Sequence, residues 1–155
     1  MHAHAEFTRQ RLADLPNADV RRVDSQLLIE ETGRTYRRPL YFLDAHGADN
    51  WPLERELAAI VRGVVLIHDF DVGHERFSFD TYNGIACGPQ VLARMSAPPD
   101  TYSTPDPHAS WPLPCLQTGR RSGVGIIAID MDPGPLAGHP QLLTRHLTAG
   151  RVTNP

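Results

Sequence analysis

The feature that most constrains this chain is a pair of short apolar segments, Leu40–Leu43 and Val64–Ile67, separated by a stretch with a helical pattern. Neither segment alternates apolar with polar residues, and unbroken apolar runs are typical of strands that are covered on both faces. Such strands usually belong to parallel sheets that are flanked by helices. The pair therefore predicts two neighbouring strands of a parallel sheet.

The stretch between the two segments predicts a helix that starts near Pro52. Proline is tolerated in the first helical turn, because its missing N–H would have no partner there. Glu54 and Glu56 lie near the positive end of the helix dipole, which favours the same start. The apolar stripe that we expect to face the core consists of Leu53, Leu57 and Ile60. Strand, helix and strand together predict a βαβ unit.

An aspartate directly or closely follows each of the two strands, Asp44 after the first and Asp69 after the second. A right-handed crossover places both residues at the same edge of the sheet, at the carboxyl ends of the strands. Open α/β folds bind their ligands at this edge. We therefore expect any chemistry of this protein to involve these two carboxylates.

The remaining segments complete a single α/β domain over residues 1–155, with a core at about 5–130 and a tail at 131–155. We expect an edge strand at Asp19–Val23 and a further apolar strand at Val124–Ile129. Helices are expected at Ala5–Leu15, at Gln26–Thr32, from near Pro89, and at Gln141–Leu147. Many prolines between positions 98 and 114 argue against long helices or central strands in that region. The predicted sheet is mostly parallel and flanked by helices.

Composition narrows the class of protein further. The net charge is −3 and the cationic side chains are all Arg and scattered, so we expect no nucleic-acid partner. No apolar run is long enough to cross a bilayer, so we expect no membrane partner and a cytoplasmic location. Cys87 and Cys115 match no metal-binding spacing and are expected to be free thiols in a reducing compartment.

Several segments, taken in order, resemble the carboxyl-terminal two-thirds of class I S-adenosylmethionine-dependent methyltransferases. The segments are RQRLADLPNADVRRVDS, FLDAH, WPLERELAAI, VVLIHDF, FDTYNG and GRRSGVGIIAI, and the resemblance covers roughly residues 5–130. It implies a Rossmann-like fold, S-adenosylmethionine as cofactor, and methyl transfer to a hydroxyl or similar nucleophile of a small-molecule substrate.

The chain departs from this family in one respect, since the glycine-rich cofactor turn after the first strand is missing. The only Gly-x-Gly, at Gly123 and Gly125, opens a strand and not a helix, which is the wrong context for a cofactor loop. The chain thus resembles a methyltransferase that lacks its first βαβ unit. We expect the exposed edge beside Leu40–Leu43 to be filled by Asp19–Val23 or by a homodimer through that edge.

The resemblance also assigns roles to acidic residues, and a histidine close to them in the sequence is a further candidate. Asp24 matches a position near the adenine of the cofactor, although Asp-Ser before a helix is equally a helix N-cap. Asp44 and Asp69 match strand-end acids that bind a divalent ion, such as Mg²⁺, near the reacting methyl group. Asp44 is therefore expected to bind the cofactor or the metal ion, and Asp69 to bind the metal ion or to act in catalysis. His46 is the best-placed candidate for a general base and a third metal ligand.

Two other functions are consistent with these residues. A metal-dependent hydrolase would use Asp44, His46, Asp69 and His74 as ligands, although no hydrolase motif accompanies them. A non-enzymatic remnant of the fold would act in binding or assembly. His68 is expected to point away from Asp69, because successive strand residues face opposite sides. Aromatic residues that could line an acceptor pocket or anchor loops are Phe77, Phe79, Tyr82 and Trp111.

Overall fold

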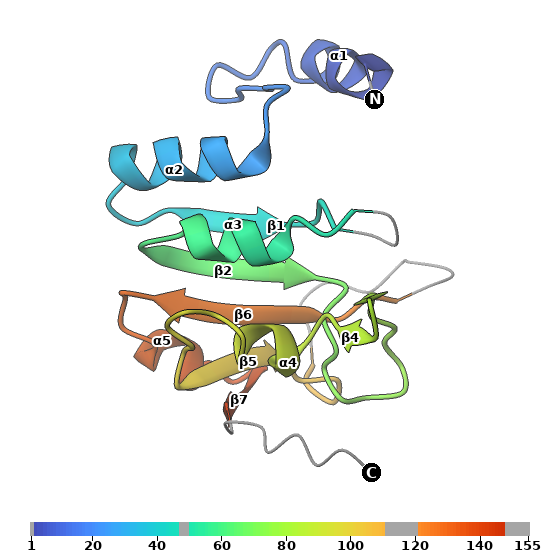
Figure 1. Cartoon of the computed structure of the whole chain (residues 1–155), viewed down its shortest axis with the longest axis vertical. Helices are drawn as coiled ribbons and strands as arrows, with labels where there is room; N and C mark the ends of the chain where they lie inside the picture. Colours follow the sequence, from blue (N-terminus) through green and yellow to red (C-terminus); the bar gives the residue numbers. More distant parts are fainter. Residues whose placement is uncertain (1, 47–49, 111–120, 148–155) are drawn as a thin grey trace.

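A five-stranded mixed sheet forms the centre of the computed structural model, which describes residues 2–46, 50–110 and 121–147. The strand order is β1-β2-β6-β5-β7 (Figure 1). The strands are β1 (Leu40–Leu43), β2 (Gly63–His68), β5 (Thr101–Pro105), β6 (Val124–Ile129) and β7 (Leu142–His146). β1 and β2 are parallel, whereas β2 with β6, β6 with β5, and β5 with β7 are antiparallel.

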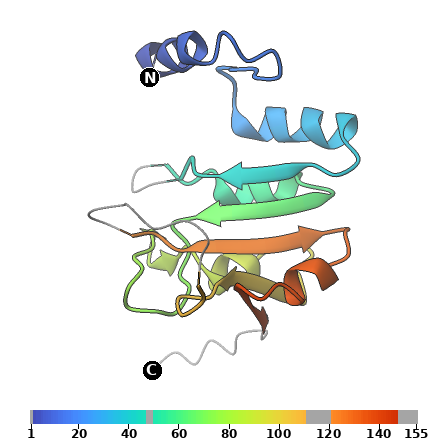
Figure 2. The same ribbon diagram turned by 180° about the vertical axis from the view of Figure 1, so that it is seen from behind.

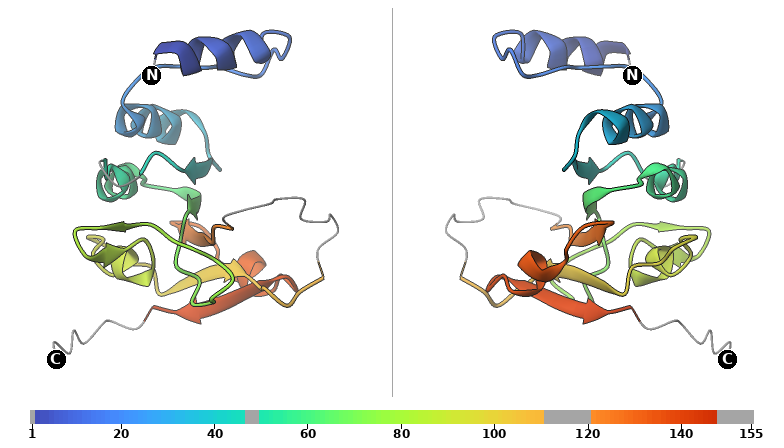
Figure 3. Two further views of the ribbon diagram at one scale, coloured as in Figure 1. Left: turned by 90° about the vertical axis from the view of Figure 1, so that its right-hand side faces the viewer. Right: turned by 90° about the vertical axis from the view of Figure 1, so that its left-hand side faces the viewer.

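Helices lie on both sides of this sheet, and the first helix stands apart from it, beyond the second (Figure 1). The helices are α1 (His2–Arg11), α2 (Ser25–Thr35), α3 (Leu53–Ala59), α4 (Pro89–Leu92) and α5 (Gly134–Ala137), and a small hairpin joins β3 (Thr81–Tyr82) to β4 (Ile85–Ala86). α2, α3 and α4 lie on one side of the sheet and α5 on the other (Figure 3). Seen from behind, β1 and β2 carry no helix on their other face among the described residues (Figure 2). No helix within the described ranges has the length and apolar character needed to span a membrane.

The predicted βαβ unit is confirmed as β1-α3-β2. The parallel register pairs Leu40 with Val64 and Leu43 with Ile67. α3 begins directly after Pro52, and its predicted stripe is buried against the sheet: Leu53, Leu57 and Ile60. This packing follows from local rules, a proline-started amphipathic helix between two apolar strands.

The prediction that both faces of β1 are covered is wrong. Tyr41 and Leu43 are buried beneath the helices, but Leu40 is 67% exposed and Phe42 is 58% exposed on the opposite face. An apolar run does not distinguish a strand covered on two faces from an edge strand covered on one. β1 is an edge strand here, because no described strand pairs with its outer side.

The expectation of a mostly parallel, Rossmann-like sheet is not confirmed. The fold is α/β, but its sheet is mixed and its pairings are mostly antiparallel. The apolar segment Val124–Ile129 is a strand as predicted, yet it runs antiparallel to β2, with His68 opposite Val124. Apolar composition sets the burial of a strand and not its direction, which depends on the route of the preceding chain.

Three element predictions are wrong for identifiable reasons. The prolines between positions 98 and 114 do not exclude a central strand, because β5 lies between β6 and β7 with Pro105 only at its last position. The segment 19–23 is not a strand, and its Arg21 instead pairs with Asp19 and Glu31 at 2.6 and 2.7 Å on the exposed surface. The predicted helix over 141–147 is β7, which pairs with β5 and is held by a 2.8 Å hydrogen bond between the hydroxyls of Ser103 and Thr144. Tertiary pairing here overrides a weak helical pattern.

Candidate metal site

Three side chains converge where β1 and β2 end. Asp44 follows β1, His68 is the last residue of β2, and Asp69 follows it. Their ligand atoms all lie within 4.8 Å of one another. His68 Nδ1 lies 3.0 Å from Asp44 Oδ1 and 3.4 Å from Asp69 Oδ2. The parallel pairing of β1 with β2 brings these residues together, as the sequence predicts for the two aspartates.

The three side chains differ in their exposure to solvent. The side chain of Asp44 is 50% exposed, that of His68 is 33% exposed, and that of Asp69 is 12% exposed. His68 Nδ1 itself is buried and has no hydrogen-bond partner of good geometry among the described residues, although two carboxylates lie near it. A polar atom of this kind is costly to bury unless something satisfies it.

The orientation of His68 corrects the sequence prediction. Simple alternation would place His68 and Asp69 on opposite faces. Asp69, however, has a φ of +51°, a conformation that few non-glycine residues adopt, and this turns the chain sharply after β2. The turn brings its carboxylate back toward His68. Positive φ at an aspartate has no sequence signature, so the candidate ligand His68 was missed.

Packing of Phe70 holds this turn in place. Phe70 is fully buried, and its N–H donates a 3.1 Å hydrogen bond to the carbonyl of Gly123. A Cβ at Gly123 would lie 2.2 Å from the carbonyl oxygen of Phe70, and one at Gly125 would lie 2.5 Å from its ring. These glycines are therefore needed for Phe70, in the loop that follows β2, to approach the backbone of residues 123–125. This contact holds the neighbouring Asp69 in position.

His46 is buried and does not join the three converging side chains. Its Nε2 donates a 2.9 Å hydrogen bond to the backbone carbonyl of His68, so this nitrogen carries the proton. Its ring also lies edge-on to Trp51, with centroids 5.2 Å apart, and Trp51 stacks on Tyr82. His46 thus ties the loop after β1 to the end of β2 and positions His68.

Cys87 is a buried free thiol that lies next to the hydrogen bond between His46 and His68. Its Sγ is 3.6 Å from both His46 Nε2 and the carbonyl oxygen of His68. Burial raises the pKa of the thiol to about 12, with further contributions from the carboxylates of Asp80 and Asp69. A raised pKa disfavours the reactive thiolate form, and Cys87 is a free cysteine as expected from the sequence. Cys115 lies outside the described residues.

The other predicted site residues lie apart from this group. Asp24 caps α2, since its Oδ1 accepts a 2.9 Å hydrogen bond from the backbone N–H of Gln26. His74 Nδ1 accepts from the N–H of Arg76, and its ring lies 5.6 Å from that of His108. Among the predicted aromatic residues, Tyr82 stacks on Trp51, Phe77 packs on the core, Phe79 is largely exposed, and Trp111 lies outside the described residues.

Comparison of the chain with protein-family models, with curated proteins and with solved structures found no match.

Proposed function

We propose that Asp44, His68 and Asp69 bind a divalent metal ion. The observation that carries this proposal is the convergence of one imidazole nitrogen and two carboxylates at the ends of two adjacent parallel strands. Separations of 3.0 and 3.4 Å between the donor atoms are those of neighbouring ligands around an ion with bonds of roughly 2.1 Å. The buried Nδ1 of His68, which has no hydrogen-bond partner among the described residues, would coordinate the ion through its lone pair.

The donor set indicates which metals suit the site. Carboxylates favour hard ions such as Mg²⁺ and Mn²⁺, whereas an imidazole favours Zn²⁺, Fe²⁺ and similar ions. A mixed set of two carboxylates and one imidazole therefore fits Mn²⁺, Fe²⁺ or Zn²⁺ better than the Mg²⁺ expected from the two aspartates alone. The half-exposed side of Asp44 leaves room for water or a substrate atom in the remaining positions.

Within this proposal the chain is a methyltransferase-like domain that acts on a hydroxyl of a small molecule, with S-adenosylmethionine as donor. This part is supported by the resemblance of residues 5–130 to that family. A bound ion would supply Lewis acidity toward the acceptor hydroxyl. Asp69 and His68 would hold a fixed orientation through the turn at Asp69 and the hydrogen bond from His46. His46 is therefore assigned a positioning role and not that of a base.

Titration calorimetry with MnCl₂ and ZnCl₂ tests the metal site. We expect saturable binding by the wild-type chain and a loss of affinity of at least about tenfold in Asp69→Asn, because a ligand charge is removed. Asp24→Asn is the matched control, since Asp24 is an aspartate that caps α2 outside the site. Equal affinities of wild type and Asp69→Asn, or no binding by either, would contradict the proposal.

Titration with S-adenosylmethionine distinguishes the enzymatic function from its alternative. Binding of both metal and cofactor, followed by methyl transfer to a hydroxyl of a small molecule, supports a methyltransferase. Metal binding without cofactor binding favours the alternative that the domain serves in binding or assembly. The four-ligand arrangement needed for a hydrolase is not supported, because His46 and His74 bond elsewhere within the described structure.

A further inference from the structure

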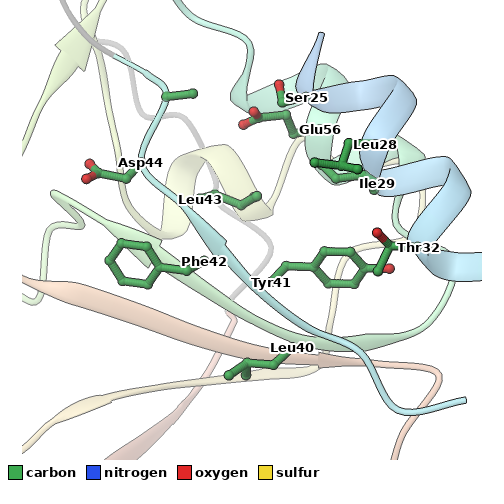
Figure 4. A pocket seen from close by; sticks show the side chains of 11 residues that line it. Ser25, Leu28, Ile29, Thr32, Leu40, Tyr41, Phe42, Leu43, Asp44 and Glu56 are labelled. Carbon is green, nitrogen blue, oxygen red and sulfur yellow. The ribbon is translucent and has the colours of Figure 1, made fainter. Parts of the chain in front are cut away.

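A groove runs along the outer edge of β1 beneath α2 (Figure 4). Its volume is about 470 Å³, and residues from both faces of β1 line it together with Leu28 and Thr32 of α2 and Glu56 of α3. The groove is open along the strand. Because the lining includes consecutive residues of β1, the groove follows the strand edge itself and is not a hollow on one face.

The backbone of β1 presents hydrogen-bonding groups to this groove that no described strand pairs with. The carbonyl of Pro39 accepts a 3.1 Å hydrogen bond from the N–H of Val64 in β2. Backbone groups of successive strand residues point to alternate sides, so those of Leu40 and Phe42 point away from β2 and into the groove. No strand in the described ranges pairs with them. Such an edge accepts an added strand.

The lining also carries a buried carboxyl oxygen to which no described group forms a hydrogen bond. Glu56 is 1% exposed, and its Oε2 is buried with no hydrogen-bond partner. Asp44 lies at the end of the same groove, and none of the described lining residues has a cationic side chain. A carboxylate buried without a partner is costly, and a cationic group placed beside it would remove the cost. The groove therefore favours an occupant with a Lys or Arg side chain directed toward α2.

We propose that this groove binds an extended peptide segment of another protein, which adds to the sheet beside β1. The segment would carry apolar side chains on the face of Leu40 and Phe42, which are 67% and 58% exposed, and a basic side chain on the opposite face toward Glu56. This proposal does not depend on the metal site or on methyl transfer.

A second copy of the chain fits the groove less well. Two-fold antiparallel pairing through β1 keeps both α2 helices on the same side of the extended sheet. α2 lies beside β1 on the α3 side (Figure 3), so the two copies of α2 would compete for the space above the paired strands. The segment Leu40–Leu43 also contains no cationic group for Glu56. The homodimer predicted from the sequence becomes an outcome of the test.

The test uses ¹⁵N-labelled full-length protein without metal, titrated with the blocked hexapeptide Val-Thr-Val-Lys-Val-Thr. The Lys would share a face with the Thr residues, toward α2, and the Val residues would lie beside Leu40 and Phe42. The matched peptide has Glu in place of Lys. We expect saturable amide shifts at Leu40 and Phe42 and binding at least about tenfold tighter for the Lys peptide. In Glu56→Gln this preference falls to about threefold or less.

N-methylated peptides test whether binding is strand addition. Methylation of the alternate amides that face β1 should abolish binding, whereas methylation of the other set should not. A one-residue shift of register would bring the unmethylated amides to β1, but it would also turn the Lys side chain away from Glu56. Such a shift therefore does not restore the proposed binding mode. Absence of saturable shifts up to about 5 mM, or equal effects of the two methylated sets, would overturn the proposal. A concentration-dependent dimer that shifts the same amides without peptide would also overturn it.

Discussion

The contact between Phe70 and Gly125 gives the most specific prediction for the fold. A Cβ added at Gly125 would lie 2.5, 2.6 and 2.7 Å from three ring carbons of Phe70, whereas ordinary carbon contacts lie at about 3.5–4.0 Å. The ring must therefore move by roughly 1 Å. Phe70 is fully buried and packs against Tyr102, so no free space receives it. We expect Gly125→Ala to lower the free energy of unfolding by about 1–3 kcal/mol.

Urea unfolding followed by circular dichroism measures this loss. Gly138→Ala is the matched control, because a Cβ there would make only an ordinary 3.4 Å contact and its φ is −86°, and it should change stability by about 0.5 kcal/mol or less. Phe70→Leu should relieve the clash, so the double variant should be more stable than the sum of the single effects predicts, by about 1 kcal/mol. Additive effects, or Gly125→Ala at wild-type stability, would refute the packing argument.

Three further predictions concern single side chains. The pKa of Cys87 is raised from 9.0 to about 12, so the folded protein holds this proton more tightly than the unfolded chain does. The resulting contribution to the free energy of unfolding is complete below pH 9 and is lost as the pH rises toward 12. In Cys87→Ala, urea unfolding at a series of pH values should show a smaller fall in the free energy of unfolding over this range. His46→Ala should weaken Mn²⁺ binding by about 10–100-fold in calorimetry, since it releases the backbone of His68, while leaving the metal ligands in place. Glu56→Gln should raise the midpoint temperature of thermal unfolding, because it replaces a buried carboxyl group whose Oε2 has no hydrogen-bond partner among the described residues. A lower midpoint temperature would contradict the argument that burial of this carboxyl group is costly.

The βαβ unit could be predicted from sequence because its rules are local. Unbroken apolar strands, a proline at the helix start and a short crossover together determine where Asp44 and Asp69 lie. The direction of β6 could not be predicted, because it depends on how the chain returns to the sheet. β5 and β7 were missed for a related reason: each is weak alone, and their pairing, which places Thr101 opposite His146, exists only in the folded chain.

The candidate site likewise has a part that could be predicted from the sequence and a part that could not. Its two aspartates follow from strand order, but the third ligand depends on the φ of +51° at Asp69, a feature of tertiary structure. His46 looks like a ligand in sequence because it lies two residues after Asp44. In the structure its Nε2 instead donates a hydrogen bond to the backbone carbonyl of His68 at the end of β2. Proximity in sequence to one strand end did not indicate which side of the chain the imidazole would occupy.

The position of Asp69 also depends on residues far from it in sequence. The turn after β2 is held between the hydrogen bond from Phe70 to Gly123 and the packing of its ring on Gly125. Small residues are therefore required at the start of β6 and directly before it for the carboxylate to reach His68. A bulky residue at either glycine would push the loop outward and separate the ligand atoms, which now lie within 4.8 Å of one another. Gly125→Ala should consequently weaken Mn²⁺ binding even under conditions where the protein remains folded, and Phe70→Leu should restore part of that affinity. Unchanged metal affinity in folded Gly125→Ala would show that the site does not depend on this support.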